Sequence, residues 1–302
     1  GNPLFRAHDV DDALIRVVQV VQFNAELFTV LNQLLHLNAG HLTGRVNVFG
    51  LRRDVMIHGS EGFTRLAHLA AMGAQAGIIA SATRVIFREG DTEKTLMLLN
   101  TNGYPIVAQT WVDNGDVNSA PELSRAPFVT LPSVFALPPS ALKGLRILFA
   151  GANLPTDRES VFWLNLYEIP PSQPTRPPLT SRVTLAMNTQ MKIFYRPKAL
   201  KGNAENAAEA VSFSLQKSPG GYLLRCHNRS AFYLSFARIA VQTGRRDYPV
   251  RQESDMMTAP FSMRDYHLDG VAAPTLPSQI TVQATFINDQ GQQIVKSYTA
   301  TP

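Results

Sequence analysis

Residues 182–200, RVTLAMNTQMKIFYRPKAL, carry a long and regular alternation of apolar and polar positions. One face of an extended strand would carry Val183, Leu185, Met187 and Met191. The opposite face would carry Thr184, Ala186, Asn188 and Gln190. A period of two predicts a β-strand over 182–196. Pro197 is expected to end this strand, because proline donates no hydrogen bond to a sheet.

Short apolar stretches separated by turn residues follow one another from Gly77 onward. Those before the long strand lie at 79–87, 94–99, 106–112, 145–149 and 161–169. Those after it lie at 211–215, 222–226, 232–241, 261–263, 279–287 and 293–299. Because no long amphipathic helix interrupts them, the pattern favours antiparallel β-sandwiches over a βαβ fold. A polar, alanine-rich stretch after Pro197 divides the series into two predicted domains, 77–198 and 199–302.

The first 55 residues follow a different pattern. Asp11 and Asp12 can cap a helix, and apolar residues from Leu14 to Leu35 recur at helical spacing. Residues 1–55 are therefore predicted to be a helical or disordered extension of unknown role. The alternatives are a partner helix, a leader, or sequence upstream of the true start.

Residues 56–76 have some features of a signal peptide. Arg65 precedes a short apolar run, and Ala74-Gln75-Ala76 fits a small-x-small cleavage site. Cleavage there would make Gly77 the mature start, which we favour. The alternative is a short surface helix.

The amino-acid composition limits the classes of function that this chain could have. Hydrophobic residues make up 45% of the 302 residues and charged residues 17%, which is enough apolar material for a core. The net charge of +5 is mild and its basic residues are scattered, so nucleic-acid binding is not expected. The one cysteine, Cys226, excludes an internal disulfide and a CxxC metal knuckle. No apolar run reaches the length of a membrane helix.

Catalytic and metal-binding patterns are not found in the sequence. His227 and His267 are isolated histidines, and GSEG at 59–62 is not a nucleophile elbow. Asp157, Glu159 and Asp289 could form an acid pair, but carboxylates near arginines are more often ion-paired. We therefore expect no enzymatic activity, no metal and no cofactor.

Two cations lie within otherwise apolar strand segments. Arg84 is part of ATRVIF, and Lys192 lies between Met191 and Ile193. A charge at such a position needs a partner. Each cation could pair with an internal carboxylate, or both could point into a cleft and hold an anion from outside. The C-terminal carboxylate of another protein is one candidate anion.

Five segments carry a family resemblance: ATRVIF, VAQTWVDN, DRESVFWLNLYEIPP, MKIFYRP and FINDQGQ, in this order. Together they resemble the periplasmic chaperones of the chaperone–usher pathway, which assemble pili and fimbriae. The resemblance covers residues 78 to about 298 and leaves residues 1–55 without a counterpart. It implies an all-β fold of two immunoglobulin-like sandwiches arranged as a boomerang.

The resemblance also implies a mode of action. A pilus subunit lacks the last strand of its own sandwich, and such a chaperone inserts one of its strands into the gap. Val183, Leu185 and Met187 would be the donated residues. At about 3.3 Å per residue, 183–196 could span roughly 45 Å, enough to serve both proteins.

The same resemblance implies roles for five charged residues. Arg84 and Lys192 match the two cations that anchor the subunit's terminal carboxylate and so set the register. Glu159, Arg196 and Asp289 match a charge network that fixes the angle between the domains. The short, proline-rich segment 170–182 resembles that of the short-loop subclass.

The sequence thus predicts a periplasmic chaperone whose partners are pilus or fimbrial subunits and an outer-membrane usher. An unloaded chain could also cover its strand by self-association. Two other classes stay open. A structural or adhesive surface protein would need no cations beside an exposed donor strand, and a hydrolase on a sandwich scaffold would need a triad or metal cluster.

Overall fold

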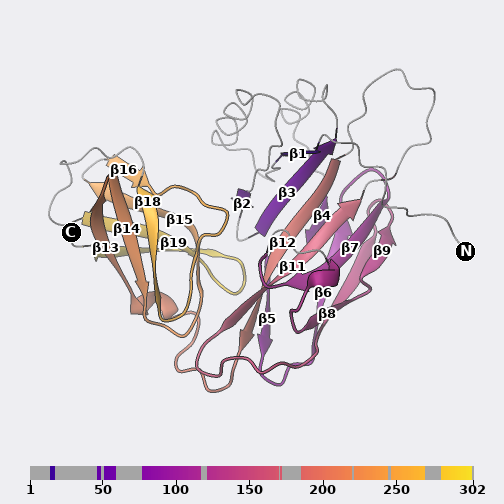
Figure 1. Cartoon of the computed structure of the whole chain (residues 1–302), viewed down its shortest axis with the longest axis horizontal. Helices are drawn as coiled ribbons and strands as arrows, with labels where there is room; N and C mark the ends of the chain where they lie inside the picture. Colours follow the sequence, from indigo (N-terminus) through magenta and orange to yellow (C-terminus); the bar gives the residue numbers. More distant parts are fainter. Residues whose placement is uncertain are drawn as a thin grey trace, which may run out of the picture.

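In the computed structural model the chain forms two β-sandwiches that meet at an angle (Figure 1). The structure describes residues 14–17, 46–48, 51–58, 77–116, 121–169, 171, 185–219, 221–243, 246–268 and 280–300. The first three ranges and residues 185–186 are described by their backbone. Within these ranges nearly all regular structure is β-strand, so the predicted all-β fold class is confirmed. No helix in the described residues is long and apolar enough to cross a membrane.

The first sandwich packs one sheet of four strands on a larger sheet. The smaller sheet has the order β4-β6-β10-β8, formed by Ile78–Ala80, Glu93–Asn100, Leu142–Phe149 and Phe128–Leu131. The larger sheet contains β5 (Arg84–Arg88), β7 (Ile106–Asp113), β9 (Val134–Leu137), β11 (Ser160–Ile169) and β12 (Leu185–Arg196). Alternate residues of both sheets face a shared apolar core, which includes Phe87, Leu98, Leu145, Leu164 and Ile193.

Strand β12 has different partners along its two edges. On one edge it pairs with β11 over Met187–Tyr195. On the other edge its end, Lys192–Arg196, pairs in parallel with β5, and its beginning, Leu185–Gln190, pairs antiparallel with β3 (Leu51–His58). Strands β1 (Leu14–Val17) and β2 (Val46–Val48) in turn pair with β3. In Figure 1, β3 runs alongside β12 at the edge of the first sandwich.

The second sandwich has its own core and packs two sheets of three and five strands within the described residues. Its strands are β13 (Val211–Ser218), β14 (Gly221–Asn228), β15 (Leu234–Thr243), β16 (Arg246–Pro249), β17 (Met257–Thr258), β18 (Ser262–Leu268), β19 (Ile280–Ile287) and β20 (Gln293–Ala300). The predicted linker after Pro197 contains a short 3-10 helix, Ala207–Ala210, whose first two alanines are buried.

The structure corrects three expectations about individual elements. The stretch 79–87 is not one strand: β4 ends at Ala80 and β5 begins at Arg84, and the two belong to different sheets. The alternating segments of β8 and β9 were missed as strands, as was β16. The helix predicted from Leu14 onward is wrong at Leu14–Val17, which pair with β3 as a strand, and the rest of that helix lies outside the described residues. The predicted helical or disordered extension 1–55 also contains strand residues 46–48 and 51–55, and β3 continues to residue 58 within the possible signal peptide.

Candidate functional site

Strands β5 and β12 bring the two predicted cations together. In their parallel ladder Arg84 lies opposite Lys192. Neighbouring Met191 and Ile193 face the core of the first sandwich, so by alternation Lys192 faces away from it, toward the second domain. Both cations are buried, with 5% of Arg84 and 1% of Lys192 exposed. The sequence hypothesis that both residues share one location therefore matches the geometry.

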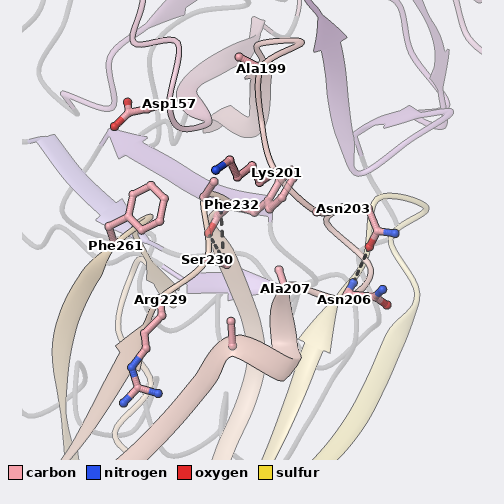
Figure 2. A pocket seen from close by; sticks show the side chains of 13 residues that line it. Asp157, Ala199, Lys201, Asn203, Asn206, Ala207, Arg229, Ser230, Phe232 and Phe261 are labelled. Carbon is pink, nitrogen blue, oxygen red and sulfur yellow. Dashed lines mark hydrogen bonds between the residues drawn. The ribbon is translucent and has the colours of Figure 1, made fainter.

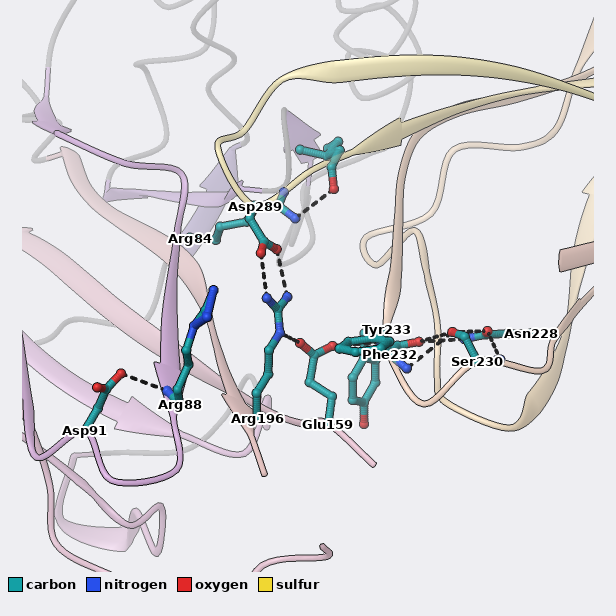
Figure 3. Close-up of polar contacts among 11 residues, drawn as sticks. Arg84, Arg88, Asp91, Glu159, Arg196, Asn228, Ser230, Phe232, Tyr233 and Asp289 are labelled. Carbon is teal, nitrogen blue, oxygen red and sulfur yellow. Dashed lines mark hydrogen bonds and ion pairs between the residues drawn. The ribbon is translucent and has the colours of Figure 1, made fainter. Parts of the chain in front are cut away.

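Arg84 has unused hydrogen-bonding capacity. Its Nη1 donates to the backbone oxygen of Ile287 in the second domain at 3.2 Å (Figure 3). Its Nε and Nη2 are buried and have no hydrogen-bond partner among the described residues. Burial lowers the pKa of Arg84 to about 10, although the negative charges of Asp289 and Glu159 oppose the shift. The guanidinium thus stays charged at neutral pH while two of its nitrogens are left without an acceptor.

Lys192 is more fully surrounded. Its Nζ lies 3.5 Å from Oγ of Ser235 and 3.9 Å from Oδ1 of Asp255, both in the second domain. The ammonium also lies 5.3 Å from the centre of the Trp163 ring, within range of a cation–π contact. An internal carboxylate is therefore present near Lys192, at the outer limit of an ion pair. Arg84 makes no such ion pair among the described residues.

This arrangement is chemically suited to an anion. Two cations on adjacent strands repel one another, and an unpaired buried N–H group costs about 1–3 kcal/mol. A carboxylate placed between them would accept charge-assisted hydrogen bonds from both, which are about twice as strong as neutral ones. The site in this state is closed by Ser235, Asp255 and Ile287, so a ligand would have to displace contacts from the second domain.

A network of charges joins the two domains beside the cations (Figure 3). Arg196, at the end of β12, donates from Nε to Glu159 at 2.6 Å and from Nη1 and Nη2 to Asp289 at 2.5 and 2.7 Å. Glu159 also accepts from the backbone N–H of Tyr233 at 2.8 Å. The three residues singled out in the sequence are thus in direct contact, and each carboxylate is paired rather than free to act as an acid.

The turn that carries Asp289 is shaped for this contact. Gly291 has φ of +80°, and a Cβ there would lie 2.5 Å from Oγ1 of Thr83. Only glycine combines that backbone conformation with so close an approach. The turn can therefore pack closely against Thr83, the residue before Arg84, and this packing places Asp289 within hydrogen-bonding distance of Arg196.

The two carboxylates of the network titrate in opposite directions. Burial raises the pKa of Glu159 to about 7, even though Arg196 and the Tyr233 N–H favour its charged form. Burial also pushes the pKa of Asp289 upward, but the hydrogen bonds and charge of Arg196, with Arg84, outweigh burial and hold it below its ordinary value. For Arg196 burial is likewise outweighed, and its two carboxylates raise its pKa.

The predicted donor strand differs from expectation in one respect. Its edge is not open: β3 pairs with Leu185–Gln190. Unpaired backbone groups on an exposed edge are unfavourable and invite association, which gives a physical reason for this pairing. Met187 is 6% exposed. The side chain of Leu185, the whole of Val183 and nearly all of segment 170–182 lie outside the residues that the structure describes.

Other candidates from the sequence are not brought together. Asp157 pairs with Arg158 on the surface, and Cys226 is buried and free. His227 and His267 lie on β14 and β18, and no group of three metal-ligating side chains occurs in the described ranges. A pocket of about 480 Å³ lies between the linker after Pro197 and the residues around Phe232 and Phe261 (Figure 2). Neither Arg84 nor Lys192 lines it.

Sequence reasoning missed the second domain's share of the site. Ser235 and Asp255 contact Lys192, and Met257 packs with Trp163 and Phe194 in an apolar cluster between the domains. No local pattern marks these residues, because their role depends on how the two domains meet. Trp163, in the apolar segment VFWLNLYEI, lies opposite Lys192 in the β11–β12 ladder, but this pairing is a finding of the structure and not of the sequence.

Comparison with known proteins agrees with the fold and the motifs. Residues 77–201 match the family model of the pili and flagellar-assembly chaperone PapD N-terminal domain, and residues 206–298 match that of the PapD C-terminal domain. The chaperone protein FimB/FhaD of Bordetella pertussis is 33% identical over 220 residues, which is 71% of this chain and 86% of that protein.

Solved structures give the same result. The chaperone YadV, known from Escherichia coli, matches with a TM-score of 0.60 and 30% identity, over 74% of this chain and 98% of that one. The Salmonella enterica SafB chaperone, solved in complex with the SafA pilin, matches with a TM-score of 0.59 and 27% identity, over 75% and 97% of the two chains. These are chaperones and not enzymes, and the chain belongs to the PapD family of fimbrial assembly chaperones.

Proposed function

We propose that this chain is a periplasmic chaperone that captures pilus subunits by donor-strand complementation and delivers them to an outer-membrane usher. Family membership supports the general role. The structure of SafB with a pilin supports the class of partner, because that related chaperone was solved with such a subunit bound. Export to the periplasm follows from the same proposal.

The observation that carries the proposal is the Arg84 guanidinium next to Lys192, two of whose buried nitrogens have no hydrogen-bond partner among the described residues. A buried cation with two idle nitrogens is unfavourable for the free protein and useful only when an acceptor arrives. The C-terminal carboxylate of a subunit has the charge and the paired oxygens to fill that role. Contacts of the second domain with Lys192 would be exchanged for contacts with the ligand.

Strand β12 supplies the second half of the proposal. Its parallel pairing with β5 ends at Lys192, so the anchor lies at the point where the strand edge becomes available for another partner. A subunit chain whose last residue is held at the anchor would run along Leu185–Gln190. Leu185 and Met187, with Val183 before them, would then lie opposite the open core of the subunit. A side chain that passes from solvent into that core would contribute about 1.5–3 kcal/mol, and Met187, which is already buried, would contribute less.

Co-expression with a pilus subunit encoded beside the chaperone tests the anchor. Lys192→Met keeps the aliphatic stem over Trp163 and removes the charge, and we expect it to remain folded and lose recovery of the complex. Lys143→Met is the matched control, because Lys143 also lies over an aromatic ring, Phe135, at 5.8 Å, but in the other sheet. Equal recovery of the complex with both variants would contradict the anchoring role.

A further inference from the structure

The edge that donation requires is occupied by a segment of the same chain. Strand β12 pairs with β11 along one edge. Along its other edge, β5 covers Lys192–Arg196, and β3 is the one described strand that pairs with the preceding residues, Leu185–Gln190. Six residue pairs form the antiparallel ladder, from Leu185 opposite Ile57 to Gln190 opposite Arg52. A strand edge can pair with one neighbour at a time, so β3 and an incoming subunit strand exclude each other.

The register of this ladder matches the alternation of β12. Residues directly opposite each other in an antiparallel pair share one face of the sheet. Leu185 lies opposite Ile57 and Met187 opposite Val55, so apolar positions of β12 meet β-branched apolar positions of β3. A slip of one residue in either direction would place a polar residue opposite one of the two, Asp54 opposite Met187 or His58 opposite Leu185. Segment 51–58 therefore fits this edge in a specific alignment.

Strand β3 is also supported from its far side. Strand β1 pairs with its end, from Val17 opposite Val55 to Leu14 opposite His58. Strand β2 pairs with its beginning, from Val46 opposite Arg53 to Val48 opposite Leu51. Three strands added to a sheet form a more stable unit than one strand alone. All three precede the residues that match the family models, so they are an addition to the shared chaperone fold.

We propose that Leu51–His58 is an internal cap that covers the donor edge in the unloaded chain and is displaced when a subunit strand arrives. This inference rests on the proposed function of β12, and it requires that the exported chain keeps residues 51–58, in place of the mature start at Gly77 that the sequence pattern favoured. The cap is tethered to the same molecule, so its effective concentration at the edge is high and independent of dilution. Capture then requires the uncapped fraction, and the apparent affinity for a subunit falls in proportion to that fraction.

A pair of cysteines tests whether the cap forms in solution. Met56 and Ala186 are opposite each other in the ladder, where Cα atoms lie about 4.5–5.5 Å apart, within the range of a disulfide. The full-length variant M56C/A186C should form an intrachain bond under mild oxidation. The control D54C/A186C is displaced by two residues and should not. Cys226 can stay, because it is buried and burial raises its pKa to about 12, which makes its thiol unreactive.

Three results of this cross-linking experiment would overturn the cap. They are failure of the M56C/A186C pair to form a bond, equal yields for the two cysteine pairs, and a bond that joins two chains instead of one. The last result would mean that β3 covers the edge of a second copy. Mass spectrometry of the unreduced protein separates the intrachain bond from the interchain bond.

Capture of a subunit tests what the cap does. The M56C/A186C chaperone is prepared in two forms, with its disulfide closed or reduced. Each form is mixed with the pilus subunit encoded by the neighbouring gene, which is diluted from guanidinium so that it refolds in the presence of the chaperone. We expect the closed form to yield about tenfold less complex than the reduced form, which should match the wild-type chain under the same reductant. Equal capture by both forms would overturn the regulatory role and the use of this edge by subunits. A different result would overturn the cap alone: M56C/A186C forms no bond, while the separate variant Leu185→Asp loses capture. Donor-strand capture would then remain supported.

Discussion

Arg84 and Lys192 lie directly opposite each other on adjacent parallel strands, and two nitrogens of the buried Arg84 guanidinium have no hydrogen-bond partner among the described residues. Two like charges at such a position oppose folding. Under the proposed function, this pair is retained because it holds a ligand, and not because it stabilises the free chain. The predictions below separate these two contributions.

Arg84→Met should abolish subunit capture without lowering stability. The substitution removes two buried nitrogens that lack partners together with one hydrogen bond to the backbone oxygen of Ile287, so the free energy of unfolding should stay within about 1 kcal/mol of wild type. Arg88→Met is the control, because Arg88 is an exposed residue on the same strand. Urea unfolding and co-purification measure the two effects. A large loss of stability with Arg84→Met would show that the guanidinium is structural.

Leu185→Asp should weaken capture through the donor strand. Loss of one buried leucine contact corresponds to about 1.5–3 kcal/mol, or about 10-fold to 150-fold in affinity. Leu142→Asp makes the same chemical change at a leucine that is 67% exposed on the other sheet, and should leave capture unchanged. Binding to a refolding subunit is the measurement. Undiminished affinity with Leu185→Asp would mean that another surface binds the subunit.

Arg196→Lys should loosen the junction between the domains. Lysine carries a point charge and cannot hold Glu159 and Asp289 in the three contacts that the guanidinium makes. We expect a loss of about 1–3 kcal/mol and a broader distribution of interdomain distances in small-angle scattering. Arg146→Lys disrupts a similar two-bond pair with Glu93, but at an exposed position within one sheet, and should cost less than about 1 kcal/mol. An unchanged scattering profile for Arg196→Lys would refute the role in domain orientation.

Glu159 should make stability depend on pH between about 4.5 and 7. Its folded pKa of about 7 lies above its unfolded value of 4.5, so in this window the folded state binds more protons than the unfolded state. Stability from this group is therefore complete below pH 4.5 and is lost as the pH rises to 7, by about 1–3 kcal/mol.

Glu159→Gln should flatten that slope, which urea unfolding at a series of pH values would measure. Asp157→Asn is a nearby control, because Asp157 is exposed and pairs only locally with Arg158. An equal slope in wild type and Glu159→Gln would assign the pH dependence to another group. Asp289 has the opposite sign, because its lowered pKa contributes stability that is lost only as the pH falls below about 4.

The sequence predicted best what depends on local alternation. The long strand and the stretch 161–169 were found because period two is strong there, and β11 and β12 follow these bounds closely. Arg84 and Lys192 were found because a charge in an apolar strand is conspicuous. Their register, with one opposite the other, could not be read from spacing, since the residues are more than a hundred positions apart.

Contacts between distant segments were beyond the sequence pattern. Residues 81–83 carry no turn signal strong enough to show that the chain leaves one sheet after Ala80 and enters the other at Arg84. Segment 51–58, LRRDVMIH, alternates only weakly, so nothing in it pointed to pairing with Leu185–Gln190. Asp255 and Ser235 act through the meeting of two domains, which tertiary packing alone determines.

The contact between Lys192 and Trp163 has an optical consequence. Indole emission responds to electric charge close to the ring, and the Lys192 ammonium lies 5.3 Å from the centre of a tryptophan that is 3% exposed. The chain's other tryptophan, Trp111, lies near Tyr167, whereas the printed ring contacts of Arg84 and Lys192 among the described residues are with Phe194 and Trp163. Occupation of the anchor by a carboxylate would therefore change the fluorescence of Trp163, and the unlabelled protein would report the arrival of its client in real time.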